Sequence, residues 1–163
     1  MYDDRYMSLA IQMAKKGFKK GDVPVGCVIV KDGKILAMTH NRKEQKKMTT
    51  RHAEIEAIEK ASKKNKDWRL NDCEMYVTLE PCCMCAGAIL NARIKEVYIG
   101  AMETKYGCCG SAYNLLNSDK FTTHSIAKTG FRQEECAKLL QDFFKKRRES
   151  NKCWLKKILI LII

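Results

Sequence analysis

Apolar β-branched runs alternate with amphipathic segments along this chain, and the alternation limits the folds that it can adopt. Residues 23–30, VPVGCVIV, form a continuous apolar run that is typical of a buried strand. Asp32-Gly33 is a hairpin turn signal, and residues 35–41 supply the returning strand. Further strands are expected at 73–80 and 96–101, and helices at 3–20, 52–64, 82–94 and 133–149. Helices that alternate with strands after an opening hairpin predict an α/β layered sheet.

The helix expected at 52–64 follows a basic segment, 42–51, which is interpreted as a loop. Ile55, Ile58 and Ala61 fall close to one face of this helix, whereas Glu56, Glu59, Lys60 and Lys63 fall largely off that face. We therefore expect the isoleucines to be buried and the glutamates to be exposed.

Composition narrows the class of protein. A length of 163 residues predicts one domain with a genuine core, and the 45 % apolar content excludes a disordered chain. Met1 is followed by acidic and polar residues and not by a signal peptide pattern, so a cytoplasmic, reducing location is expected. Cysteine clusters in such a location indicate metal binding or catalysis more often than disulfides. The longest apolar run, 158–163, is far shorter than the roughly 20 residues of a membrane-spanning helix.

The charge balance is strongly basic. Lys and Arg number 31 against 19 acidic residues, which gives a formal net charge of +12. Such a charge suits a polyanionic partner, with nucleic acid the first candidate. A lysine-rich surface that only keeps the protein soluble explains the charge equally well.

Three cysteines lie within four positions in the stretch LEPCCMCAG. Pro81 is placed at the first turn of a helix, where proline has no cost. Cys82 and Cys85 are then three residues apart, on one side of the helix start, where the helix N-terminus stabilises thiolates. Cys83 is rotated away by about 100° per residue and is expected to pack inside. The sequence therefore predicts that Cys82 and Cys85 bind a metal.

His52 begins the preceding helix and supplies a third ligand. Three protein ligands leave one position of a tetrahedral zinc site open, which is the mark of a catalytic zinc. Glu54 follows two residues after His52 and, at a helix end aimed at the metal, is placed to carry protons. The alternative without a metal is that His52 is a buried core histidine and that Cys82 and Cys85 form an unrelated redox pair. The joint pattern H-x-E and P-C-x-x-C, each at a helix start, favours a zinc deaminase.

The chain resembles the bacterial tRNA-specific adenosine deaminases from its first helix to about residue 150. The stretches that carry the resemblance are VPVG (23–26), HN (40–41), HAE (52–54), WRL (68–70), MYVTLEPC (75–82), MCAGA (84–88), GA (100–101), GS (110–111) and DFF (142–144). The resemblance implies a three-layer α/β/α, cytidine-deaminase-like fold with a central mixed sheet of about five strands. It also implies that the wobble adenosine of an arginine tRNA anticodon is converted to inosine.

The resemblance assigns roles to single residues. One zinc per subunit is held by His52, Cys82 and Cys85, and Glu54 transfers the proton. Asn41 is similar to an asparagine that hydrogen-bonds the flipped nucleotide. The family also implies a homodimer that holds the anticodon loop at the subunit junction. The basic or aromatic positions that match RNA contacts are Lys105, Lys145, Lys146, Arg147, Arg148 and Phe144, although one of Phe143 and Phe144 is expected to pack.

Several positions depart from the family pattern. Glu103 stands at a position of a substrate loop where the family often has aspartate. Arg51 replaces a residue that is usually small, and it is expected to contact an RNA phosphate or only to line the rim of the site. Cys108 and Cys109 are interpreted as small packing residues. The segment 151–163, which follows the deaminase domain at 1–150, has no counterpart. Its apolar end could cover a surface, mediate assembly or touch a membrane, although no membrane partner is expected.

Two other functions remain possible from the sequence. A free-base or nucleoside deaminase, acting on guanine, cytosine or cytidine, would use the same zinc and the same glutamate but would not need the basic C-terminal helix. A deaminase-like module that only binds RNA would be expected to lack Glu54 or one of the three metal ligands. Glu54 and all three ligands are present in this sequence.

Overall fold

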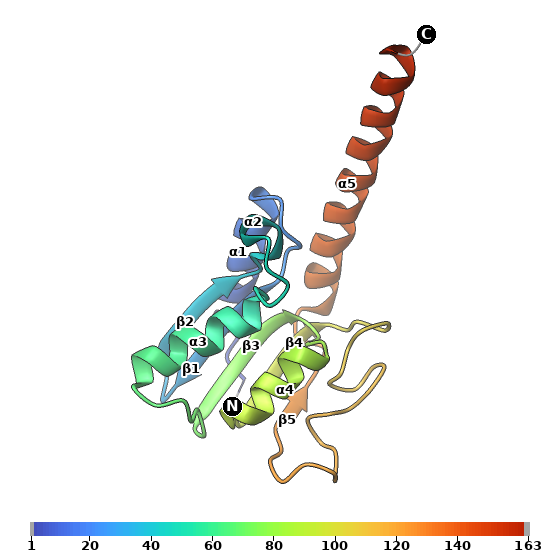
Figure 1. Ribbon diagram of the computed structural model, residues 1–163. Coiled ribbons are helices and arrows are strands. Elements are labelled where there is room, and N and C mark those ends of the chain that lie inside the picture. The colour runs from blue at the N-terminus through green and yellow to red at the C-terminus, as the bar shows by residue number, and fades with distance from the viewer. Residues whose placement is uncertain (1, 162–163) are drawn as a thin grey trace.

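A five-stranded mixed sheet forms the centre of the protein (Figure 1). The computed structural model describes residues 2–161, with side chains for residues 2–150. The strands are β1 (Gly26–Lys31), β2 (Lys34–His40), β3 (Cys73–Leu79), β4 (Glu96–Ala101) and β5 (Ile126–Lys128), in the order β2-β1-β3-β4-β5. β1 is antiparallel to β2 and β3, whereas β3, β4 and β5 are parallel.

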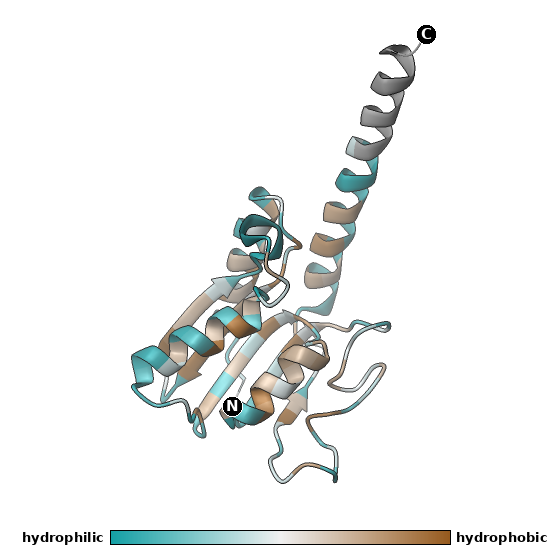
Figure 2. Cartoon of the chain, viewed as in Figure 1, coloured by the Kyte–Doolittle hydropathy of each residue, from teal (hydrophilic) through white to brown (hydrophobic). Residues whose placement is uncertain are grey.

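Helices cover both faces of the sheet. They are α1 (Asp4–Lys19), α2 (Lys43–Lys46), α3 (Ala53–Asn65), α4 (Cys83–Ala92) and α5 (Gln133–Leu161). α1 and the first turns of α5 pack on one face, and α3 and α4 on the other, so two apolar clusters sandwich the sheet. The far end of α3 is hydrophilic (Figure 2). The three-layer α/β/α fold expected from the sequence is confirmed.

A glycine allows α1 to lie directly on the sheet. A Cβ atom at Gly26 would lie 1.9 Å from the carbonyl oxygen of Ala10 and 2.6 Å from the amide nitrogen of Ala14. Only a residue without a side chain fits this crossing. The Gly26 amide also donates to Thr78 Oγ1 at 3.0 Å, which joins β1 to the end of β3.

Several elements differ from the prediction. β5 was not expected, because three residues after a long loop carry no strand pattern. α2 occupies part of the segment interpreted as a basic loop, and α5 continues beyond the expected end at 149. The buried face of α3 is formed by Ala53, Ala57 and Ala61, whose small side chains let the helix lie close to the sheet. Of the residues expected on this face, Ala61 is buried, whereas Ile55 and Ile58 are only partly buried.

Glu56 is buried, contrary to the prediction. Its carboxylate lies 3.5 Å from the guanidinium of Arg51, which supplies the opposite charge that a buried carboxylate needs.

The start of α4 corrects two predictions. Pro81 precedes the helix and is not in its first turn, because Cys82 is the N-cap residue with extended backbone angles, φ −73° and ψ 175°. Cys83 is exposed and does not pack inside. It is the first residue of α4, and its side chain at this helix start is exposed to solvent and is not covered by the core.

The apolar tail expected at 151–163 lies outside the residues whose side chains are described. Within the described part of the chain, we find no helix with the length and apolar character needed to span a membrane.

Candidate active site

Two helices begin side by side at the end of β3, and their first residues form a cluster of metal-binding side chains. His52 is the N-cap residue of α3, and Cys82 is the N-cap residue of α4, but neither side chain caps its helix. His52 Nδ1 lies 3.7 Å from Cys82 Sγ and 3.5 Å from Cys85 Sγ. All three ligand atoms lie within 4.8 Å of one another. The predicted residues thus meet at one point in the described structure.

The protonation of the cluster suits a soft metal cation. The hydrogen bond from the Cys85 thiol and that with His52 lower the pKa of Cys82 to about 3, although burial opposes the shift. The pKa of Cys85 is raised by its bond to the Cys82 thiolate and by burial, and the pKa of His52 is raised chiefly by its contact with Cys82. A lowered pKa at Cys82 favours its thiolate form, which is the state that binds a metal. Two sulfurs and one imidazole nitrogen form a donor set that fits zinc.

A cavity of about 380 Å³ opens beside the cluster. Five of the predicted site residues line it, together with Val23, Val25, Lys43, Leu79, Glu80 and Tyr106; the five are Asn41, His52, Glu54, Cys82 and Glu103. Its size lies at the lower end of the range for small-molecule sites. The space is sufficient for a single flat base.

Glu54 lies at the floor of this cavity with only 4 % of its surface exposed. Burial raises the pKa of its carboxyl group, while its own backbone amide and the nearby His52 partly oppose the shift. A raised pKa allows a carboxylate to take up a proton near neutral pH and to release it again.

Asn41 is held by an acidic residue that the sequence analysis missed. Asp22 is completely buried, and its carboxylate accepts hydrogen bonds from the backbone amides of Glu44 and Gln45 at 2.7 and 3.2 Å. It also accepts from the Asn41 side chain at 3.5 Å. Asp22 thereby caps α2 and orients Asn41 toward the cavity. An aspartate directly before an apolar run was its only signal in the sequence.

The family described as MafB19-like deaminase matches residues 1–148. The tRNA-specific adenosine deaminase of Bacillus subtilis (strain 168) is 42 % identical over 150 residues, covering 92 % of this chain and 93 % of the relative. A structure from a study of A-to-I editing by tRNA:A34 deaminases at the wobble position has a TM-score of 0.82 and 35 % identity, and the match covers 85 % of this chain and 100 % of that chain. The chain belongs to the tRNA-specific adenosine deaminase family.

A guanine deaminase from Bacillus subtilis is also similar. Its structure matches with a TM-score of 0.61 and 41 % identity over 64 % of this chain and 67 % of the other. Proteins similar to this chain thus include an enzyme that acts on a free purine base.

Arg51 and Lys105, two residues with predicted RNA contacts, lie outside the cavity lining. Arg51 pairs with Glu59 at 2.9 Å and with Glu56 at 3.5 Å, so its charge is partly neutralised within the protein. Lys105 is exposed, and its backbone amide donates to the Glu103 carboxylate at 3.0 Å.

The basic run of α5, residues 145–148, lies beside α2, the helix that contributes Lys43 to the cavity. Lys146 and Arg147 line a separate groove with Phe18, and Arg147 lies 3.7 Å from the carboxylate of Glu44 in α2. Phe143 packs edge-on against Phe18, with ring centroids 5.4 Å apart. Phe143 is thus the phenylalanine of the pair that packs, as expected for at least one of them. Lys145, Arg148 and Phe144 are exposed.

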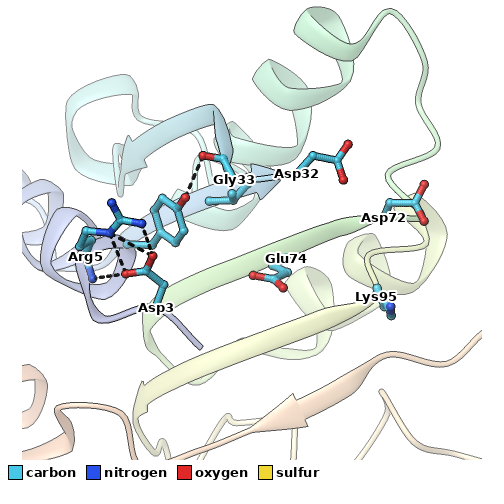
Figure 3. A pocket seen from close by; sticks show the side chains of 9 residues that line it. Asp3, Arg5, Asp32, Gly33, Asp72, Glu74 and Lys95 are labelled. Carbon is cyan, nitrogen blue, oxygen red and sulfur yellow. Dashed lines mark hydrogen bonds and ion pairs between the residues drawn. The ribbon is translucent and has the colours of Figure 1, made fainter. Parts of the chain in front are cut away.

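A further hollow lies at the opposite end of the strands and is separate from the deaminase site (Figure 3). It is lined by carboxylates at the ends of α1, β1 and β3, among them Asp32 and Asp72. Asp3 in this hollow pairs with Arg5 at 2.6 Å and caps α1. The hollow shares no residue with the cavity beside His52.

Proposed function

We propose that the protein is a zinc-dependent tRNA adenosine deaminase, which converts the wobble adenosine of an anticodon to inosine and releases ammonia. One observation carries the proposal: a buried carboxylate, Glu54, shares a cavity with three convergent metal donors, in a member of this family. We propose His52, Cys82 and Cys85 as the ligands of one zinc ion per chain. An arginine tRNA substrate, a homodimeric state and a cytoplasmic location belong to the same proposal.

Bound zinc would supply a Lewis acid that lowers the pKa of a water molecule. Glu54 would accept one proton from the attacking water and deliver it to a ring nitrogen of the purine, and it would then carry the second proton of that water to the amino group that leaves C6 as ammonia. Asn41, oriented by Asp22, hydrogen-bonds the flipped nucleotide at the mouth of the cavity. The narrow cavity admits one base, which fits an enzyme that takes its target nucleotide out of the stack.

The charge distribution supports an RNA substrate. Lys43 lines the cavity, and the basic run of α5 reaches the same side of the molecule through the contact between Arg147 and Glu44. Positive residues beside the site would bind the phosphates that flank the target base.

A guanine deaminase is the second candidate, and its support is the similarity to the Bacillus subtilis enzyme. Guanine is uncharged and lacks phosphates, so a guanine deaminase would gain nothing from the basic residues around the cavity.

Product analysis tests the two candidates together. The zinc-loaded protein is incubated with an anticodon stem-loop that carries adenosine at the wobble position, and separately with adenosine, cytidine and guanine. We expect inosine in the stem-loop alone, and loss of at least about 100-fold in turnover in Glu54→Ala, because a positioned proton carrier contributes roughly that much or more. That variant should keep its zinc and its RNA affinity. Turnover of guanine with no inosine in the stem-loop would overturn the proposal.

A further inference from the structure

Glu80 is a buried carboxylate in the cavity that the proposed reaction does not use. It follows β3 directly and has 3 % of its surface exposed. Its Oε1 accepts the backbone amides of Cys109 at 3.0 Å and Ser111 at 2.9 Å. Its Oε2 accepts the backbone amide of Glu103 at 2.9 Å and also the hydroxyl of Ser111.

All four donors belong to one segment, residues 103–111. This segment contains no regular helix or strand, only turns and isolated bridges. A second contact fixes it beside the metal ligands, since the Cys108 amide donates to the carbonyl of Pro81 at 2.9 Å. A Cβ atom at Gly107 would lie 2.2 Å from Glu80 Oε2, so the backbone is closed tightly around the carboxylate.

The same segment forms one wall of the substrate cavity. Glu103 and Tyr106 both line the cavity, and the Tyr106 ring is 73 % exposed at its mouth. Without the carboxylate, the described structure offers no other acceptor in place for the amides of Glu103, Cys109 and Ser111. The Cys109 amide is buried and the other two are partly buried, so the loss of their acceptor would be costly and the segment would move to find new partners.

We propose that Glu80 is a positioning residue that holds residues 103–111 as a fixed wall of the cavity and thereby sets where Glu103 and Tyr106 meet the substrate. This inference rests on the proposed function for its substrate, but the anchoring itself does not depend on any substrate.

A second proton carrier is the competing role for Glu80, and the hydrogen bonds argue against it. Four hydrogen bonds, from the amides of Glu103, Cys109 and Ser111 and from the Ser111 hydroxyl, converge on its two oxygens. Both oxygens are occupied by donors that a protonated acid would have to give up. Glu80 therefore has a fixed set of acceptor contacts and no free oxygen with which to exchange a proton with the substrate.

Glu80→Gln tests the role at nearly constant volume. The amide group of glutamine would point an N–H₂ toward backbone N–H groups, which removes about half of the acceptor capacity. We expect faster hydrogen exchange at the amides of Glu103, Cys109 and Ser111 in the zinc-loaded protein without RNA. With the stem-loop, KM should rise roughly 10-fold while kcat stays within about 3-fold, because weakened charged hydrogen bonds act here on binding and not on chemistry.

Two further variants make the test specific. Ser111→Ala removes only one of the four bonds, so it should show the same changes more weakly, and it remains informative if Glu80→Gln does not fold. Combined with Glu80→Gln, its effect should be less than additive, since both act on the same contact. Glu96→Gln is the matched control, because Glu96 also accepts hydrogen bonds, from Tyr98 and Lys128, at the other end of the sheet.

Unchanged exchange at the three amides in Glu80→Gln would overturn the anchoring role. A fall in kcat with constant KM and a shifted pH profile would instead make Glu80 a proton carrier and would also overturn it. Failure of the proposed function is distinguishable, because the parent protein would then leave the stem-loop unmodified whatever the exchange data show.

Discussion

Glu54 and Glu80 line the same cavity, yet their surroundings move their pKa values in opposite directions. Glu54 is buried with few donors, and its pKa is raised. Glu80 is equally buried, but it accepts four hydrogen bonds and its pKa is lowered. Two carboxylates whose pKa values are moved apart in this way can serve as a proton carrier and as a fixed anion within one site.

The difference between these two glutamates also shows what the sequence could predict. Glu54 was predicted because it stands two residues from His52 in a motif whose chemistry depends on side chains. Glu80 and Asp22 act on backbone amides of distant segments, and a backbone amide has no signature in the sequence. Such acceptors become visible only when the fold has brought the segments together.

Zinc content separates the three neighbouring cysteines. Cys82→Ser should lose most of the bound zinc, because a hydroxyl is a far poorer ligand than a thiolate. Cys83→Ser is the matched control and should keep the metal, since Cys83 is exposed and does not belong to the cluster of His52, Cys82 and Cys85. Metal analysis by atomic emission gives the ratio of zinc to protein. Full zinc retention in Cys82→Ser would contradict the assigned ligand set.

His40 should make the stability of the fold depend on pH. Burial lowers its pKa, and the nearby cations Arg42, Lys20 and Lys16 add to the shift, against a hydrogen bond to the Asn41 carbonyl. Among the described residues its Nε2 has no hydrogen-bond partner. The folded state therefore keeps the ring neutral at a pH at which the unfolded chain protonates it, so unfolding in mild acid takes up a proton.

The free energy of unfolding should consequently fall as the pH drops below about 6.5, the ordinary pKa of histidine. Urea unfolding of the zinc-loaded protein between pH 5 and 8 measures this dependence. His40→Asn is expected to be less stable overall but to lose less of its stability between pH 7.5 and pH 5.5. The comparison with the parent removes the contribution of His52. An identical pH dependence in both proteins would exclude His40 as its source.

The elements with a strong apolar pattern were predicted, and the weak ones were not. β1, β3 and β4 are buried runs of apolar residues, and their positions follow from the sequence within a few residues. β5 is a three-residue strand held by pairing to β4, and α2 is a single turn capped by Asp22. Both depend on partners far away in the chain, so local patterns could not reveal them.

The close contact between α1 and β1 at Gly26 can be tested by its effect on the free energy of unfolding. Gly26→Ala should destabilise the protein by roughly 1–3 kcal/mol or more, because the added methyl overlaps the backbone of α1 at Ala10. Gly87→Ala is the control within α4. A Cβ atom at Gly87 meets nothing within 4 Å, so the change should stabilise the helix by about 0.5–1 kcal/mol. Thermal and urea unfolding at equal protein concentration would measure both; a neutral Gly26→Ala would show that α1 can shift without loss.

At the scale of the whole molecule, the net charge of +12 is known from the sequence, but its placement is not. The fold brings the basic end of α5 beside α2, which carries Lys43 into the cavity. Residues separated by about a hundred positions in the chain thus share one side of the site. Only this placement turns a basic composition into a hypothesis about where RNA phosphates bind.

Salt dependence tests that hypothesis. Affinity for the stem-loop should fall steeply with salt, and changing Lys145, Lys146, Arg147 and Arg148 together to alanine should weaken binding and flatten the dependence. Each lost phosphate contact reduces the slope of log K against log salt by roughly 0.7 on single-stranded RNA. Arg147 lies 3.7 Å from Glu44, so we expect a reduction smaller than four full contacts would give.

A control with the same change in charge isolates position from net charge. Lys60, Lys63, Lys64 and Lys95 are exposed and do not line the cavity beside His52. Their replacement by alanine removes the same four charges, so any effect of net charge alone appears in both variants. Fluorescence anisotropy of a labelled stem-loop at several salt concentrations compares the two with the parent. We expect the α5 variant to have the flatter slope and an unchanged zinc content. Equal slopes in the two variants would mean that the basic run of α5 is only a solvated face. The RNA would then have to be bound by other residues around the cavity.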